Sequence, residues 1–291
     1  YQRSGLGKAL VVGRADDVKA KLTAAGMEDA YRELEVVNAA NTQHLETYKS
    51  FLYNRLQRKG SDSKDIHRLA ARDRHVFAAL MLAHGHGDGL VTGATRKSAH
   101  VLERLNHVFD ANAKHGAVGI TALLHKGRIV FIGDTLVHEW PNEEDLANIA
   151  EKGAKVARHM GLEPRVAFVS FSTFGYPVSE RAEKMQRAPD VLDARGVDFE
   201  YEGEMTVDVA LNAESQKNYP FSRLTGPANI LVVPARHSAS ISVKLMQEMA
   251  GATVIGPILT GLDKSIQICS TTSTANDILN MAILAACKVG E

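Results

Sequence analysis

A run of hydroxyl side chains stands directly ahead of the last helix that the sequence predicts. Ser270, Thr271 and Thr272 are followed by two more hydroxyl residues, and Asp277 comes near the start of the helix. Free backbone N–H groups and the helix dipole attract negative charge at such an end, so the run is a candidate anion site as well as an N-cap. Asp277 has two interpretations, a capping carboxylate or a base that accepts a proton. Capping is the simpler one.

A second candidate is the small-residue turn over residues 88–95. Its glycines and hydroxyls would let the backbone approach a phosphate group or a pantetheine chain, and two basic residues follow it. A tight turn followed by a capped helix explains the same residues, so both interpretations stay open. The candidate contacts in this segment are Thr92, Gly93, Thr95, Arg96 and Lys97.

Polar residues also lie where two predicted strands end. Ser170, Ser172 and Thr173 come at the end of the strand predicted over 165–172, and His237 follows the apolar run 230–233. In open α/β sheets ligands bind at the carboxyl ends of strands. No G-x-S-x-G elbow is present, so these hydroxyls suit polar ligand contacts better than nucleophilic attack. A plain strand exit and a structural histidine are equally good explanations.

The histidines and glycines at 84–89 offer metal or dinucleotide chemistry. His84, His86 and Asp88 are three potential ligands, but no fourth follows at a recognisable spacing. The glycines are spaced G-x-G-x-G after a predicted helix, whereas the dinucleotide fingerprint follows a strand. A glycine-rich turn is therefore the favoured interpretation, and no metal site is predicted.

Composition excludes several classes of protein. Lys plus Arg and Asp plus Glu each number 34 among 291 residues, so the formal charge is zero. That balance argues against a nucleic-acid binder or a polybasic membrane-surface protein, and no apolar run reaches the ~18 residues of a membrane span. Two cysteines, Cys269 and Cys287, are too few for a disulfide scaffold, which favours a reducing, cytoplasmic compartment. The chain begins with Tyr1 rather than Met, which we interpret as a piece of something longer.

The elements that must position these residues change in character along the chain. The N-terminal third is predicted to be helical, with one helix over 45–56, a stop at Gly60 and a second apolar face that continues to Gly85. A hairpin through 125–128 follows, and then helices and strands alternate. The later helices are predicted at 141–160, 178–194, 240–250 and 277–288, and the strands at 165–172, 199–205, 230–233 and 253–259. Such alternation indicates an α/β protein with a largely parallel sheet.

Taken together, these segments resemble the phosphate acetyltransferase (phosphotransacetylase) family. The motifs that carry the resemblance are collinear from about residue 45 to the C-terminus, and their joint specificity is high. They are Asp88–Gly93 (similar to ADGLVSG), Ser170–Thr173 (SFST), Glu202–Glu204 with Asp208 (DGE…D), Gly226–Asn229 (GxAN), Gly256–Leu259 with Gly261 (GPILxGL) and Asp277–Asn280 (DIVN). The resemblance adds Asn229 to the candidate contacts.

Within that family the chain is more similar to the C-terminal domain of bacterial hybrid NADP-dependent malic enzymes. The segments that carry this are 237–241, 174–175 and 134–139. Three departures from active phosphotransacetylases point the same way, and one of them is Glu103, in place of an arginine after the Gly93 region. Their Ser-Arg-Gly-Cys-Ser segment corresponds to Ser270–Thr274 here, with Thr271 in place of the arginine. Their Asn-x-x-Asn-Ile segment corresponds to His237–Ile241, in which neither asparagine is present. In this second segment we take His237, Ser238 and Ser240 as ligand contacts. Because a dianionic acyl phosphate needs fixed positive charge, the loss at Thr271 predicts a pocket that binds but does not transfer an acyl group. Ser270 and Asp277 would then be vestigial catalytic residues.

The resemblance implies two α/β domains of phosphotransacetylase type, with largely parallel sheets and a ligand cleft between them. The first would be residues 1–120, completed by a returning segment 262–291, and the second 121–261. It also implies a homodimer through this chain and a higher oligomer in the full-length protein.

The function implied is a regulatory and oligomerisation domain that binds acetyl-CoA, or a related CoA ester, as an allosteric effector. Oxidative decarboxylation of malate to pyruvate, with NADP and a divalent metal, would belong to a malic enzyme part outside this chain. The alternative is an active phosphate acetyltransferase, which converts acetyl phosphate and CoA to acetyl-CoA and phosphate. In that case Ser270 and Asp277 would assist deprotonation of the thiol.

Overall fold

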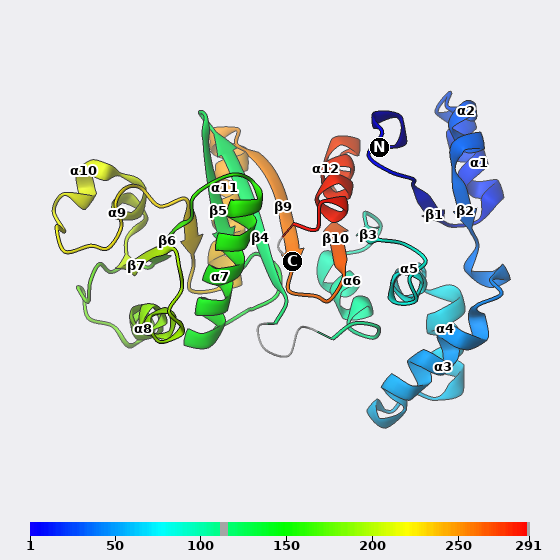
Figure 1. Ribbon diagram of the computed structural model, residues 1–291, viewed down its shortest axis with the longest axis horizontal. Helices are drawn as coiled ribbons and strands as arrows, with labels where there is room; N and C mark the ends of the chain where they lie inside the picture. Colours follow the sequence, from blue (N-terminus) through cyan, green and yellow to red (C-terminus); the bar gives the residue numbers. More distant parts are fainter. Residues whose placement is uncertain (111–115, 290–291) are drawn as a thin grey trace. The chain divides into compact units, whose positions relative to one another are not determined.

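The computed structural model describes residues 1–110 and 116–289, and the chain forms two compact units (Figure 1). Unit 1 consists of Tyr1–Asp110 and Lys264–Cys287, and unit 2 of Ala111–Asp263 and Lys288–Glu291. The sequence placed the division near residue 120 and the return at residue 262. Those predicted ranges include residues 111–115, 290 and 291, which lie outside the described residues.

Unit 1 begins with strands that the sequence did not indicate. Strands β1 (Leu10–Val12) and β2 (Glu35–Val37) pair in parallel, and helices α1 (Ala15–Ala24) and α2 (Glu28–Glu33) connect them. The prediction that the N-terminal third is helical therefore misses this short sheet. Strands of three residues are too short to display a hydrophobic period, so periodicity could not reveal them.

Three helices follow, α3 (Leu45–Leu56), α4 (Ser63–Arg72) and α5 (Arg74–Ala83). The helix predicted over 45–56 is confirmed, because Tyr48, Leu52 and Leu56 recur every fourth residue and all three are buried. Gly60 (φ +86°) ends this stretch after a short 3-10 turn (Gln57–Lys59).

The apolar face predicted to continue to Gly85 is divided between two helices. Asp73 interrupts it, because its Oδ1 accepts hydrogen bonds from the N–H groups of His75 (3.0 Å) and Val76 (3.2 Å) and so caps α5. The sequence pattern contains the reason, since Ala70 and Val76 are six residues apart, a step that does not stay on one helical face.

The rest of unit 1 packs on a two-stranded parallel sheet. Strand β3 (Gly89–Gly93) pairs with β10 (Ser265–Cys269), so that Gly93 lies opposite Cys269. Helices α5, α6 (Ser98–Leu105) and α12 (Ala275–Ala286) contact these strands. Because the strands are parallel, the residues after Gly93 and after Cys269 leave from the same edge of the sheet.

Unit 2 is built on a six-stranded sheet in the order β7-β6-β8-β5-β4-β9. The strands are β4 (Val118–His125), β5 (Arg128–Gly133), β6 (Arg165–Val169), β7 (Glu200–Met205), β8 (Ile230–Val232) and β9 (Thr253–Thr260). Among these described strands β4 runs opposite to the other five, which confirms a largely parallel sheet. The predicted hairpin is also confirmed: Lys126 (φ +48°) and Gly127 (φ +73°) form its turn, and two positive φ angles suit the twist of the paired strands.

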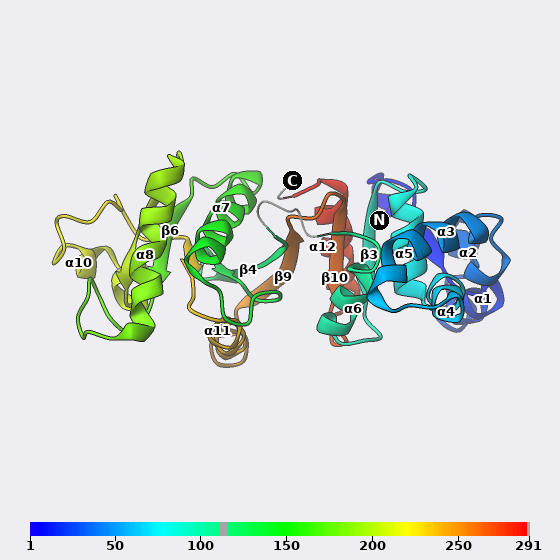
Figure 2. The ribbon, with the colours of Figure 1, turned by 90° about the horizontal axis from the view of Figure 1, so that it is seen from below.

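Helices cover both faces of the unit 2 sheet (Figure 2). Helices α7 (Glu143–His159) and α8 (Glu180–Arg195) lie on one face and α11 (Arg236–Ala250) on the other. The short α9 (Val207–Leu211) contacts β6, and α10 (Ala213–Gln216) contacts α9. Helix α7 approaches the sheet closely through Gly153, where an added Cβ would lie 2.9 Å from Cγ2 of Ile230. The core on the α11 side includes Ile132, Val169, Leu231, Val233 and Ala239.

In residues 1–110 and 116–289, no helix is both long enough and apolar enough to cross a bilayer.

Candidate ligand-binding site

Unit 2 has a pocket at the carboxyl ends of β6 and β8, which are parallel neighbours in the sheet. Its volume is about 640 Å³, and Ser170 follows β6 into it while His237 follows β8. The pocket is lined by Trp140, Glu143, Ser170, Phe171, Glu180, Glu183, Lys184, Pro234, Ala235 and His237. The structure thus brings together two of the residues that the sequence selected, at the edge where α/β sheets bind ligands.

Two aromatic rings form one wall of this pocket. The centroids of Trp140 and His237 are 5.0 Å apart, and the Trp140 side chain is 69% exposed. An exposed indole is uncommon in a folded protein unless it serves an interface or a ligand. Trp140 was not among the predicted contacts, although it is the single tryptophan of the chain and stands in a polar loop.

Lys184 supports the same wall from α8. Its Nζ donates hydrogen bonds to the carbonyl oxygens of Pro141 (3.1 Å) and Pro234 (3.0 Å) and lies 5.7 Å from the centre of the Trp140 ring. Burial lowers the pKa of Lys184, an effect that the nearby Glu143 opposes. The ammonium group therefore ties together the two loops that carry Trp140 and His237.

Three carboxylates line the pocket, those of Glu143, Glu180 and Glu183, against the single ammonium of Lys184 and the imidazole of His237. Negative charge from phosphate groups would be repelled here. The pocket suits an uncharged chain or a planar ring better than a phosphate.

The loop that carries Trp140 is fixed at both ends. At its start the buried carboxylate of Asp134 accepts hydrogen bonds from the backbone N–H groups of Gly119, Leu136, Val137 and His138 and from Nδ1 of His138. At its end Asn142 and Asp145 form a capping box at α7. The backbone that carries Trp140 is therefore fixed by contacts of the residues on either side of it.

Other predicted contacts in unit 2 lie in structural positions. The Oδ1 of Asn229 accepts from the N–H of Arg165 (2.8 Å) and its Nδ2 donates to the carbonyl of Glu163 (2.8 Å). These bonds hold Asn229 at the start of β6 and β8, the edge opposite the pocket. The structure does not bring it to Ser170.

Ser172 and Thr173 point into the protein rather than into the pocket lining. Ser172 is fully buried, and its Oγ has no hydrogen-bond partner. The Oγ1 of Thr173 accepts from the N–H of Thr206 (3.1 Å) and donates to its hydroxyl (3.2 Å). Ser238 and Ser240 lie half-buried in the first turns of α11, and neither lines the pocket.

Unit 1 has a second candidate site, at the carboxyl ends of β3 and β10. The turn after Gly93 and the hydroxyl run that begins at Ser270 lie side by side there. A Cβ on Gly93 (φ +109°) would lie 2.2 Å from the carbonyl oxygen of Cys269, and the N–H of Ala94 donates to that oxygen (3.1 Å). Only glycine permits this approach. The turn that carries Thr95, Arg96 and Lys97 therefore begins beside Ser270, and all three of its side chains are exposed.

The hydroxyl run closes on itself. The Oγ of Ser270 contacts the hydroxyls of Thr272 (2.9 Å) and Ser273 (3.2 Å), while Thr271 is exposed. Thr274 and Asp277 form a capping box, in which Oδ2 of Asp277 accepts from the N–H (2.8 Å) and the hydroxyl (2.9 Å) of Thr274. The capping interpretation of Asp277 is confirmed, and a base role would have to compete with it.

Two neighbours of this edge have shifted pKa values. The Oγ1 of Thr92 lies 2.7 Å from Nδ1 of His75, and burial lowers the pKa of His75. Burial, with a smaller contribution from Asp277, raises the pKa of Cys269 to about 11. The thiol of Cys269 is therefore protonated at neutral pH and is not a nucleophile.

The histidines at 84 and 86 pack against aromatic rings. The ring centroid of His84 lies 4.9 Å from that of Tyr48 and 5.2 Å from that of Phe51. The Nδ1 atom of His86 lies 2.7 Å from the Tyr48 hydroxyl. In the part of the chain that the structure describes, no three His, Cys, Asp or Glu side chains are placed to hold a metal ion.

The fold of the chain matches those of solved structures. The chain matches a phosphotransacetylase from Streptococcus pyogenes with a TM-score of 0.87 at 24% identity, over 97% of this chain and 86% of the other. The EutD phosphotransacetylase of Staphylococcus aureus gives a TM-score of 0.84 at 23% identity over the same shares. These likenesses show a fold of phosphotransacetylase type.

Sequence comparison identifies the family. The sequence model described as "Phosphate acetyl/butaryl transferase" matches residues 1–286, and the chain belongs to this family. The match includes the first 44 residues, where the sequence motifs gave no sign of it.

Curated relatives fall into two groups. An NADP-dependent malic enzyme of Rhizobium meliloti is 46% identical over 100% of this chain, and a phosphate acetyltransferase of Bacillus subtilis is 28% identical over 80% of this chain and 72% of its own length. The chain spans 38% of the length of the malic enzymes that it matches.

Proposed function

We propose that this chain is a CoA-ester-binding regulatory and assembly unit of an NADP-dependent malic enzyme, and that it has no acyl-transfer activity of its own. Acetyl-CoA is the effector. In this proposal NADP, a divalent metal and the oxidation of malate to pyruvate belong to a part of the protein outside this chain, and the compartment is the cytoplasm. The similarity to malic enzymes over the whole chain supports the assignment.

The observation that carries the loss of catalysis is Thr271. It is an exposed neutral residue in the hydroxyl run, where the resemblance places an arginine in active phosphotransacetylases. Transfer of an acyl group from acetyl phosphate develops negative charge that a guanidinium would stabilise, and a threonine hydroxyl is a much weaker donor. The capping bonds of Asp277 and the hydroxyl contacts of Ser270 leave both vestigial residues in structural roles.

Two features of the chain support the binding of a CoA ester. The pocket beside Trp140 and His237 is large enough for the pantetheine arm or the thioester of a CoA ester, and its carboxylates disfavour the phosphates. Arg96 and Lys97 are exposed cations beside the Gly93 edge of unit 1, which suits phosphate groups. Each of these two places is a candidate contact by itself, one in unit 2 and one in unit 1.

An apolar stripe on α11 supports a homodimer. Ile241, Leu245 and Met249 are spaced four residues apart, so they share one helical face, and they are 63%, 58% and 79% exposed. Three large apolar side chains in a row on the outside of a helix are typical of an interface. We propose that two copies of this chain pair through α11.

Two assays test the function. Calorimetry with acetyl-CoA measures binding, and a mixture of acetyl phosphate and CoA measures transfer. Saturable binding without acetyl-CoA formation supports the proposal. In the complete malic enzyme, the effect of acetyl-CoA on malate oxidation is expected to correspond to a coupling free energy of ~1–3 kcal/mol.

Active phosphate acetyltransferase is the second candidate, and the family membership favours it. Acetyl-CoA formation at ordinary enzyme rates, about 1–10³ per second, would establish it. The substitution Thr271→Arg distinguishes the two cases, because it restores the missing charge. A large gain in transfer would mean that this charge alone was lost.

A further inference from the structure

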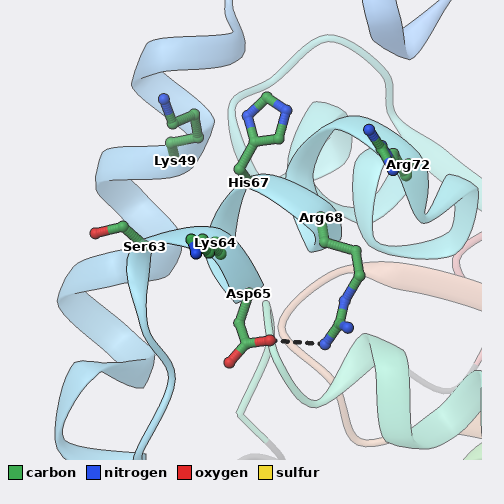
Figure 3. A pocket seen from close by; sticks show the side chains of 7 residues that line it. All are labelled: Lys49, Ser63, Lys64, Asp65, His67, Arg68 and Arg72. Atoms are coloured by element: carbon green, nitrogen blue, oxygen red, sulfur yellow. Dashed lines mark hydrogen bonds and ion pairs between the residues drawn. The ribbon is translucent and has the colours of Figure 1, made fainter.

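A second pocket lies along α4, and none of its lining residues belongs to the proposed function. It has a volume of about 470 Å³ and lies between α4 and one residue of α3 (Figure 3). Its lining consists of Lys49, Ser63, Lys64, Asp65, His67, Arg68 and Arg72. Five of these seven side chains are basic and one is acidic, in a chain whose total charge is zero.

Only part of this positive charge is neutralised within the protein. Lys49 pairs with Glu46 (2.9 Å), and Arg68 reaches back to Asp65 (2.7 Å), as the dashed line in Figure 3 shows. Lys64 and Arg72 are exposed, and neither forms an ion pair with any carboxylate in the described residues. Two unpaired cations and His67 therefore remain in one pocket.

The spacing on α4 keeps these cations together. Lys64, Arg68 and Arg72 are four residues apart and share one face, while Ile66 and Leu69 bury the opposite side. Like charges at this spacing repel and destabilise a helix, so the arrangement has a cost that a bound anion would remove.

The N-terminal end of α4 would contribute little to the binding of an anion in this pocket. The Oδ1 of Asp62 already accepts hydrogen bonds from the N–H groups of Lys64 (2.8 Å) and Asp65 (2.8 Å). An anion would therefore be held by side chains along the helix rather than by free N–H groups at its start.

We propose that this pocket binds an anion that carries two or more phosphate groups. Eight residues separate Lys64 from Arg72, which at 1.5 Å per residue places their Cα atoms about 12 Å apart along the helix axis. A single phosphate would require both side chains to bend toward one point, whereas a chain of phosphates contacts both in extended conformations. The Arg68 guanidinium and the Lys49 ammonium, which comes from α3, provide further donors.

Calorimetry of the 291-residue chain with inorganic tripolyphosphate tests this site, with orthophosphate as the comparison at the same low ionic strength. The double variant Lys64→Ala/Arg72→Ala removes the two unpaired cations from exposed positions. We expect it to weaken tripolyphosphate binding about tenfold or more, because each cation lost removes a charge-assisted contact. The matched control is Lys19→Ala/Lys21→Ala, which removes two exposed lysines of α1, and here we expect less than a twofold change.

Three outcomes would overturn the site. The first is an equal loss of tripolyphosphate binding in both double variants, because that would be a general effect of charge. The second is orthophosphate binding as tight as that of tripolyphosphate. The third is the absence of binding by the unmodified chain at millimolar tripolyphosphate. Acetyl-CoA is titrated as a second ligand, because CoA also carries phosphate groups. If acetyl-CoA binds equally well to Lys64→Ala/Arg72→Ala, the pocket on α4 is separate from the acetyl-CoA site. If acetyl-CoA binding is lost in this variant, the two sites are not separate. Because the proposed function uses other residues, failure of one proposal leaves the other measurable.

Discussion

The Nδ1 atom of His138 lies 2.7 Å from Oδ2 of Asp134, and this pair holds the loop on which Trp140 stands. Asp134 is 2% exposed, and the same carboxylate accepts four backbone N–H groups. The hydrogen bond to Asp134 raises the pKa of His138, against the opposing effect of burial, and Asp145 adds to the increase at 3.7 Å from Nε2. The loop is thus held by a charge-assisted contact.

Substitution His138→Gln is expected to destabilise unit 2 in a pH-dependent way. The pKa of His138 is raised in the folded state, so its contribution is fully present below the unfolded pKa of about 6.5 and declines as pH rises through the folded pKa. We expect a loss of about 1.5–3 kcal/mol in unfolding free energy at acidic pH, as for hydrogen bonds to charged groups, and a smaller loss at alkaline pH. Denaturant unfolding of both proteins at several pH values measures the difference. The control is His159→Gln, an exposed histidine, and a loss that grows with pH would contradict the assignment.

Trp140 offers a direct optical report on the unit 2 pocket, because it is the only tryptophan of the chain. Acetyl-CoA is expected to change its fluorescence saturably. His237→Ala removes the ring 5.0 Å from the indole, and we expect it to weaken acetyl-CoA binding about three- to tenfold, in line with an aromatic contact of ~0.5–1.5 kcal/mol. His159→Ala is again the matched control. An unaltered affinity in His237→Ala would remove His237 from the site.

The two cysteines are expected to differ in reactivity. Cys287 is exposed, whereas Cys269 is buried and has its pKa raised to about 11. At pH 8 a thiol reagent should therefore modify one cysteine rapidly and the second only after unfolding. Mass spectrometry of the modified peptides identifies which one reacts. Rapid modification of Cys269 in the native chain would show that β10 is open to solvent.

The substitution Leu245→Glu tests the dimer. It places a charge in the centre of the apolar stripe on α11, at a position that is 58% exposed in the single chain. Folding should be unaffected, while the sedimentation coefficient should fall to that of a monomer, since burying an unpaired carboxylate is costly. Lys244→Glu, on a neighbouring exposed position, is the control. A dimer that persists in Leu245→Glu would place the interface elsewhere.

The sequence predicted unit 2 better than unit 1. Alternating apolar runs and turn residues located its strands, and the rule that strand ends share an edge led to Ser170 and His237 together. In unit 1, strands of three residues are too short to show an alternation of apolar and polar residues. The division between α4 and α5 depends on the cap that Asp73 provides, and the apolar pattern on both sides of it hides that division.

Long-range contacts explain what the sequence missed at the site. Trp140 joins the pocket because Asp134 fixes its loop, and Lys184 reaches it through carbonyl groups 43 and 50 residues away in the chain. Asn229 fits a family motif, yet its amide is used to join the starts of two strands. A motif shows which residues matter without showing whether they serve a ligand or the fold.

Calorimetric titration of the chain with acetyl-CoA, with acyl transfer measured on the same sample, is the most direct test of the central claim. The account predicts a saturable heat of binding and no formation of acetyl-CoA from acetyl phosphate and CoA. Transfer at rates of about 1–10³ per second, or the absence of any heat at millimolar acetyl-CoA, would contradict it.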